Sequence, residues 1–241
     1  SDDAWRMRWA LPQSWAAFAA LPLEHQPLRD GGELLVSSLP MPMVGDPKLK
    51  PRGSLLARGL LRLFGWRVCF DGYCAPQGVV LVYPHTSNWD FVLGVLGKWA
   101  LGLQLHFWGK DSLFRIPLFK HWIRWIGGIP VDRTHRHGMV GSMVEQMKAA
   151  QARGDVFWLA AAPEGTRSLA TGWRSGAYQV AVQARVPIGL AYFDFATRTV
   201  SVTHFVQPSG DPALDLPFFA QTFAAVKGKR PELASPIQFK K

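Results

Sequence analysis

Short runs of β-forming residues alternate with segments of helical periodicity from residue 54 to residue 227. The β-type runs predict strands at residues 67–70, 78–83, 105–108, 128–132, 156–160, 187–193 and 199–206. The other segments predict helices at residues 54–65, 88–101, 116–126, 138–152, 174–184 and 215–227. Because strands separated by single helices favour a layered architecture, we expect an α/β fold with a mixed, largely parallel sheet flanked by helices on both faces.

The first 53 residues differ from this pattern. They hold Pro-rich, irregular stretches such as "SSLPMPMVGDPKLKPRGS" between short apolar pieces. We expect residues 1–53 to form an irregular N-terminal appendage that wraps the domain, and residues 54–241 to form that domain. The acidic tip "SDDAW" is not typical of a signal peptide, and an anchor upstream of Ser1 is left open because the chain does not begin with Met.

The chain carries a strong positive charge, with 27 Lys and Arg residues against 17 Asp and Glu and a formal charge of +10. Such a surplus favours anionic partners, namely nucleic acid, anionic lipid or phosphorylated substrates. The 11 tryptophans favour a membrane interface, and no stretch has the pattern of a nucleic-acid-binding motif. We therefore expect an anionic membrane surface, and no nucleic acid, among the partners.

The segment 54–65 bears on this expectation. As a helix it places Arg58 and Arg62 on one face. Another face carries Leu56, Leu60, Leu63 and Phe64. Such a basic amphipathic helix is typical of one that lies on a membrane surface, but a helix packed into the core with a solvated Arg face fits equally well. Since no apolar run is long enough to span a bilayer, we expect a cytoplasmic protein that binds peripherally to the cytoplasmic face of the membrane.

The two cysteines, Cys69 and Cys74, flank the dipeptide Asp71-Gly72, which predicts a two-residue hairpin turn. In such a hairpin the two side chains would face each other across the strands. An oxidised pair is one interpretation, and two small buried apolar side chains are the favoured one. So few cysteines form no disulfide framework, which indicates a reducing compartment.

The segment "YPHTSNWD" directly follows the predicted strand 78–83 and brings His85 and Asp90 together. The carboxyl end of a strand is where open α/β sheets bind ligands, and Asn88 is a plausible cap for the next helix. Asp90 then falls in the first helical turn and can reach back to His85. A carboxylate on one imidazole nitrogen raises the basicity of the other, which predicts a general base near neutral pH. The alternative is a local His–Asp ion pair that closes a turn.

Two further strand ends carry arginines. The segment "GGIPVDR" ends in Arg133, and "APEGTRS" carries Glu164 and Arg167 after the predicted strand 156–160. Two arginines at the edge where His85 emerges would form a forked set of donors for a phosphate group. Arg167 could instead pair only with Glu164.

In this order and spacing the segments resemble the glycerolipid acyltransferase family, which includes the lysophosphatidic acid acyltransferases, over residues 54–206. The first family block is similar at His85, Ser87 and Asp90, the second at Lys110, Pro117, Gly127, Ile129, Asp132 and Arg133, the third from Pro163 to Ser168, and the fourth at Val186-Pro187-Ile188. The chain departs from the family pattern at Pro84, Ala162 and Leu190, which leaves the acceptor and the acyl-chain preference open.

The resemblance implies an O-acyltransferase that moves a fatty acyl group from a thioester to the hydroxyl of a lysolipid such as 1-acyl-glycerol-3-phosphate. The donor would be acyl-CoA or acyl-carrier protein, with no metal and no other cofactor. His85 would be the general base and Asp90 would orient it. The implied substrate-binding residues are Ser87, Lys110, Arg133, Glu164, Gly165, Thr166 and Arg167.

Two other functions remain open on the residues alone. A lipid hydrolase could use the same pair, although no G-x-S-x-G segment supplies a nucleophile. A noncatalytic basic module that binds membranes or nucleic acid would explain the charge but would leave His85 and Asp90 without a role.

Overall fold

The structure, a computed structural model, describes residues 40–131 and 136–240. Its strands are β1 (Met41–Met43), β2 (Arg67–Phe70), β3 (Gln77–Val82), β4 (Leu105–Lys110), β5 (Gly128–Val131), β6 (Phe157–Ala161), β7 (Ile188–Asp194) and β8 (Thr199–Gln207). They form one sheet in the order β1-β8-β7-β3-β6-β4-β5, with β2 paired to another part of β8. All pairs are parallel except those of β8 with β7 and with β1, so the expected mixed, largely parallel sheet is confirmed.

The helices follow the predicted order. They are α2 (Leu55–Leu63), α3 (Asn88–Leu101), α4 (Phe119–Trp125), α5 (Arg136–Arg153), α6 (Gly176–Ala184) and α7 (Pro212–Phe223), with 3-10 turns at Pro47–Leu49, Asp111–Arg115 and Pro231–Leu233. Helix α7 begins earlier than predicted because Asp211 caps it and Pro212 stands in its first turn, where a missing N–H costs nothing. Asp132, the last residue of a predicted strand, lies outside the described residues.

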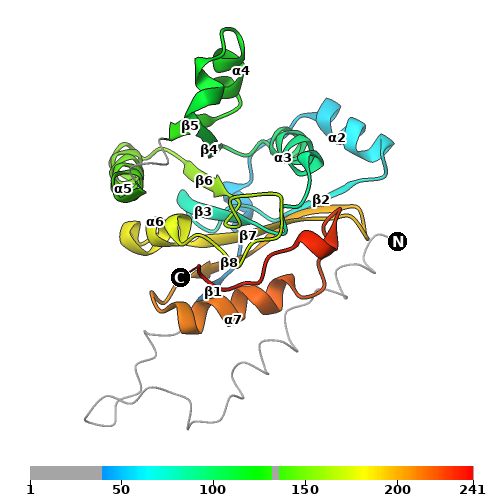
Figure 1. Cartoon of the computed structure of the whole chain (residues 1–241). Helices are drawn as coiled ribbons and strands as arrows, with labels where there is room; N and C mark the ends of the chain where they lie inside the picture. The colour runs from blue at the N-terminus through cyan, green and yellow to red at the C-terminus, as the bar shows by residue number, and fades with distance from the viewer. Residues whose placement is uncertain (1–39, 132–135, 241) are drawn as a thin grey trace, which may run out of the picture. The chain divides into compact units, whose positions relative to one another are not determined.

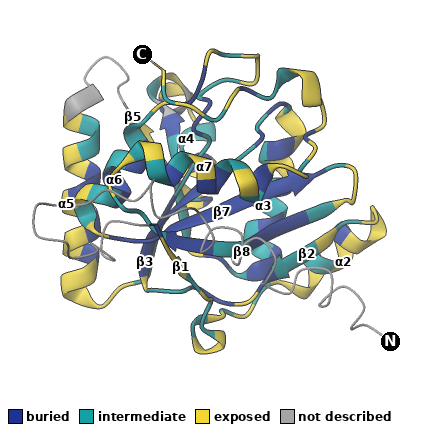
Figure 2. Cartoon of the chain, turned by 90° about the horizontal axis from the view of Figure 1, so that it is seen from below, coloured by how far each residue is buried: buried dark blue, intermediate teal, exposed yellow. Residues whose placement is uncertain are grey.

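Helices cover both faces of the sheet (Figure 1). On one face, α2 and α3 bury Leu61 and Leu93 against Phe193 of β7. On the other face, below the sheet in Figure 1, α7 packs Phe219 and Phe223 against Trp173. This two-sided burial explains why β3 and β7 are nearly continuous apolar runs, and Figure 2 shows β7 as part of the buried core of the molecule.

The predicted hairpin at Asp71-Gly72, with Cys69 and Cys74 on paired strands, does not form. Strand β2 pairs in parallel with β8, whereas β3 pairs with β6 and β7, so the Asp71-Gly72 turn joins strands that are not neighbours. The segment around Asp46 lies beside this connection instead, and its N–H donates to the carbonyl of Tyr73 over 2.9 Å. Cys69 and Cys74 are free, half-buried thiols, which contradicts the oxidised interpretation.

The region expected as an irregular appendage contributes to the sheet. Residues 41–43 form β1, which pairs with residues 205–207 of β8. The compact unit that holds the sheet therefore begins well before the expected boundary at residue 53. The rest of the expected appendage, residues 1–39, lies outside the described residues.

Helix α2 turns most of its leucines outward. Ala57 and Leu61 are buried against the core, but Leu56 is 84% exposed and Leu63 is 77% exposed. Leu60 and Phe64 are exposed as well, so the alternative in which these side chains pack into the core is wrong (Figure 2). Among the described residues, no helix is both long enough and apolar enough to cross a membrane.

Candidate active site

The site is built where β3 ends and α3 begins. Ser87 caps α3, and its hydroxyl accepts the N–H of Trp89 over 3.2 Å. Asp90 completes this capping box, because its Oδ2 accepts the N–H groups of Thr86 and Ser87 at 2.8 Å each. The expected cap, Asn88, is instead the first helical residue. The turn that shapes the loop is therefore held by the carboxylate of Asp90.

This capping arrangement brings Asp90 next to His85. The Nδ1 atom of His85 lies 3.5 Å from Oδ2 of Asp90, slightly beyond a good hydrogen bond. Within the described part of the chain, neither His85 Nδ1 nor Asp90 Oδ1 has a hydrogen-bond partner, although both atoms are buried. A small rotation of the imidazole toward Oδ2 would bring Nδ1 within hydrogen-bond distance, and catalytic hydrogen bonds of this kind often tighten only when substrate binds.

Burial sets the protonation of the pair. Desolvation, with a smaller effect from the positive charge of Arg167, lowers the pKa of His85 to about 4. Burial also raises the pKa of Asp90, against the opposing effect of its two backbone N–H donors and the nearby cations. The expected pKa near neutrality is therefore not what the surroundings of His85 produce. At pH 7 the imidazole is neutral, which is the form that accepts a proton.

Glu164 anchors the backbone of His85. This side chain is 1% exposed, and its Oε2 accepts the N–H of His85 over 2.6 Å. Its Oε1 accepts the N–H of Ser235 over 2.9 Å, and burial raises the pKa of the carboxyl group while these donors oppose the shift. Both oxygens thus bind backbone groups, and no ion pair with Arg167 occurs in the described residues. The simple Glu164–Arg167 pair is therefore wrong.

The rest of the third block surrounds this anchor. Gly165 has a φ of +67°, and a Cβ there would lie 2.5 Å from Nε of Arg174, so the position excludes side chains. The hydroxyl of Thr166 accepts the N–H of Ser168 over 3.2 Å. Arg167 is exposed, and its charge reaches both His85 and Asp90. Arg167 thus lies near enough for its charge to act on the pair, and its contact with substrate stays a prediction.

Within its described part, the structure does not place the other predicted substrate-binding residues in contact with the His85 site. Lys110 is the last residue of β4, but its side chain lies outside the described part of the structure. Arg133 lies outside the described residues altogether. The hydroxyls of Ser87 and Thr166 are engaged by their own backbone neighbours, so their contact with substrate stays a prediction.

A segment near the C-terminus completes the site and was not foreseen. We call residues 226–238 the C-terminal strap; it runs beside α7 in Figure 1, in red. The Ser235 carbonyl accepts the hydroxyl of Tyr83 over 2.9 Å, and the N–H of Arg230 donates to Thr86 Oγ1 over 3.2 Å. These partners are about 150 residues apart in sequence, at separations of 152 and 144. Nothing in the local sequence pattern indicates them.

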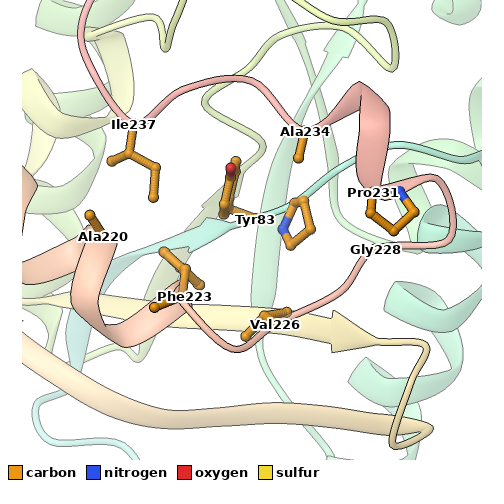
Figure 3. Close-up of a pocket in the computed structure, with 10 residues that line it drawn as sticks. Tyr83, Ala220, Phe223, Val226, Gly228, Pro231, Ala234 and Ile237 are labelled. Carbon is orange, nitrogen blue, oxygen red and sulfur yellow. The ribbon is translucent and has the colours of Figure 1, made fainter.

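The strap also walls a pocket of about 210 Å³ next to the loop that carries His85 (Figure 3). The lining residues are Tyr83, Pro84, Ala220, Phe223, Ala224, Val226, Gly228, Pro231, Ala234 and Ile237. Apart from the hydroxyl of Tyr83, the side chains in this lining are apolar, but polar backbone groups also face the pocket.

Most N–H groups of the loop around His85 are already engaged in hydrogen bonds. The N–H groups of His85, Thr86 and Ser87 donate to Glu164 and Asp90. The N–H groups of Trp89 and Asp90 donate to the hydroxyl and the carbonyl of the cap residue. These five donors hold the loop and are therefore not available to a reacting oxyanion.

Comparisons with known proteins show the family to which the chain belongs. A search of curated proteins finds no match. Among solved structures, the chain is similar to the 1-acyl-sn-glycerophosphate (LPA) acyltransferase PlsC from Thermotoga maritima, with 19% identity over 69% of this chain and 73% of that chain and a TM-score of 0.45. The model of the family described as Acyltransferase matches residues 67–189, which include the strand end with His85 and the loop with Glu164 and Arg167. The chain therefore belongs to the acyltransferase family.

Proposed function

We propose that this acyltransferase moves a fatty acyl group from a thioester to the free hydroxyl of a lysolipid, with 1-acyl-glycerol-3-phosphate as the representative acceptor. The observation that carries the proposal is the neutral, partly accessible imidazole of His85, 3.5 Å from the buried carboxylate of Asp90 at the carboxyl end of β3. The side chain of His85 is 17% exposed, so one edge of the ring is open to a substrate.

In the proposed reaction, His85 accepts one proton in the first step and returns it in the second. The Nε2 atom takes the proton of the acceptor hydroxyl while the oxygen attacks the carbonyl carbon of the thioester. The tetrahedral intermediate then collapses, the C–S bond breaks, and the thiolate leaves with the proton returned by the imidazolium. The products are an ester and a free thiol. A positioned base of this kind contributes on the order of 10²–10⁴ in rate.

Asp90 and Glu164 act on His85 from two sides. Asp90 faces Nδ1, so it fixes the tautomer that leaves Nε2 free and stabilises the imidazolium when it forms. Glu164 holds the backbone N–H of His85 and thereby the position of the ring. Substrate binding strengthens this arrangement, because excluding water from the pair increases every charge interaction within it.

Arg167 supports a phosphate-bearing acceptor. Its exposed guanidinium lies close enough to lower the pKa of His85, so a phosphate bound there would stand beside the acceptor hydroxyl. The donor is proposed as acyl-CoA or acyl-carrier protein, since both carry the same thioester. The proposed reaction needs no metal. The pocket beside Pro84, with its apolar side chains, suits part of an acyl chain.

The protein is proposed to work on the cytoplasmic face of a membrane whose lipids are anionic. Helix α2 presents exposed leucines together with the exposed Arg62. On the same side of the sheet, α4 presents the exposed Trp122 and Trp125 (Figure 1). Exposed aliphatic and tryptophan side chains next to cations match the interface of an anionic bilayer.

Incubation with a labelled acyl thioester, with and without lysolipid, separates this function from its rivals. Loss of thioester that depends on the acceptor, with a new diacyl product, supports acyl transfer. Loss that is independent of the acceptor indicates a hydrolase. No loss under either condition leaves the basic membrane-binding module as the better account.

A further inference from the structure

The exposed Lys229 of the C-terminal strap lies beside the first turn of α3. Its Nζ atom is 4.8 Å from the ring centroid of Trp89. Trp89 immediately precedes Asp90 in the first turn of α3, and its ring is 55% exposed. A lysine beyond the matched family region therefore brings its charge to the same helix end that carries the Asp90 carboxylate.

Contacts on both sides of Lys229 fix its position. A Cβ at Gly228 would lie only 2.8 Å from Thr86 Oγ1 and 3.0 Å from Pro84 Cγ, so the strap backbone presses directly on the loop. On the other side, the N–H of Arg230 donates to the same Thr86 hydroxyl over 3.2 Å. Figure 3 shows this part of the strap passing Tyr83. The backbone of Lys229 is therefore held beside the loop that carries His85.

Lys229 and Arg167 approach the pair of His85 and Asp90 from different segments. Arg167 comes from the loop after β6 and Lys229 from the segment after α7, and both charges favour the ionised form of Asp90. Trp89 offers the ammonium only the weak attraction of a ring face, and that contact is easily exchanged for a stronger anionic partner. Two cations from separate elements whose charges both act on Asp90 are suited to bind a phosphate dianion together.

We propose that Lys229 is a specificity-determining residue that binds the phosphate of the lysolipid acceptor together with Arg167. The proposal rests on the proposed function and names a residue beyond the four sequence blocks. The phosphate belongs to the acceptor because only there is it a few bonds from the reacting hydroxyl. In an acyl-CoA or acyl-carrier protein, the whole pantetheine arm separates the phosphates from the thioester.

The test compares Lys229→Gln with Lys227→Gln, which removes the same charge from an exposed lysine in the same strap. The backbone of Lys227 binds Asp194 and Phe195 at the end of β7. Kinetics are measured with a short-chain lysophosphatidic acid and with the matching monoacylglycerol, which lacks the phosphate. We expect Lys229→Gln to raise KM for the phosphorylated acceptor about tenfold or more, and KM for monoacylglycerol less than about twofold. We expect Lys227→Gln to leave both KM values near those of wild type. Lys229→Arg should keep most of the affinity for the phosphorylated acceptor.

Calorimetric binding of the two acceptors, without donor, separates failure of this proposal from failure of the proposed function. Wild type that binds lysophosphatidic acid but turns over neither acceptor contradicts the function, while the effect of Lys229→Gln on that binding still decides the role of Lys229. Equal losses for both acceptors, equal losses in Lys227→Gln, or no loss in Lys229→Gln would each overturn the proposal. A selective loss of binding to the phosphorylated acceptor supports it.

Discussion

The buried carboxylate of Glu164 accepts the backbone N–H of His85 over 2.6 Å, across 79 residues of sequence. Its other oxygen accepts the N–H of Ser235 from the C-terminal strap, so one side chain joins three separate segments at the site. Glu164 is therefore a positioning residue in this structure. At 1% exposure the side chain offers almost no surface to a substrate.

Replacing this anchor should impair catalysis through position. In Glu164→Gln the amide NH2 meets a backbone N–H that formerly donated to an oxygen, which costs about 1–3 kcal/mol in the free energy of unfolding. We expect kcat to fall at least tenfold, since a displaced His85 no longer meets the hydroxyl. Thermal unfolding and steady-state kinetics measure the two effects. Glu145→Gln, on the exposed face of α5, is the matched control, and a normal kcat in Glu164→Gln would contradict the positioning role.

The pH profile reports the surroundings of His85. Because burial and Arg167 lower its pKa to about 4, the imidazole stays unprotonated well below neutral pH. We expect kcat/KM to show no loss near pH 6.5, where an ordinary histidine titrates. The acid limb should appear only as pH falls toward 4, and circular dichroism checks that the protein is still folded there. A limb centred near 6.5 in wild type would contradict this description of the site.

Arg167→Gln should move that limb upward. Removal of a nearby positive charge makes the protonated imidazole less unfavourable, so the pKa of His85 rises and activity is lost at a higher pH than in wild type. An acceptor without phosphate is used, so that lost phosphate binding does not obscure the profile. Arg153→Gln, at the end of α5, removes an exposed arginine remote in sequence and should leave the limb in place. An unchanged limb in Arg167→Gln would show that burial alone sets the pKa.

Membrane association should depend on the exposed leucines of α2. Leu56 and Leu63 contact little of the core, so the double change Leu56→Ser and Leu63→Ser should weaken binding to anionic vesicles at least tenfold without lowering the unfolding temperature. Vesicle sedimentation measures the binding, and rising salt should weaken it by about 1 kcal/mol per screened basic residue. Val44→Ser, at another residue that is 74% exposed, is the control. Equal binding of the double variant and wild type would place the membrane contact elsewhere.

Much of the fold follows from periodicity, because the central strands β3 and β7 are buried along their length and helices such as α3 and α6 bury several residues each. The start of α3 was predictable in outline, yet the cap is Ser87 rather than Asn88, since the Asp90 carboxylate reaches the N–H of Ser87 in a capping box. The Cys69–Cys74 hairpin failed for a physical reason. A local turn pattern does not determine which strand lies beside β2. In the folded chain β2 pairs with β8 and not with the strand that follows the turn.

The site also combines features that follow from the local sequence with features that depend on long-range contacts. His85, Asp90 and Arg167 were predictable because each stands at a strand end or in the helical turn that follows it. The roles of Glu164 and Ser235 were not, because they depend on a contact across 71 residues that only the folded chain creates. The double role of Asp90 was also hidden. Since its Oδ2 accepts two N–H groups, Asp90→Asn would disturb the loop as well as the histidine and is a poor test of chemistry.

The most direct test of the central claim is therefore the turnover of His85→Ala. The side chain of His85 makes no hydrogen bond to the rest of the described chain, so its removal should leave the thermal unfolding temperature close to that of wild type. With a labelled acyl thioester and lysophosphatidic acid, we expect acceptor-dependent loss of thioester to fall by about 10²–10⁴ in the folded variant. A folded His85→Ala protein with near-normal kcat would contradict the general-base mechanism.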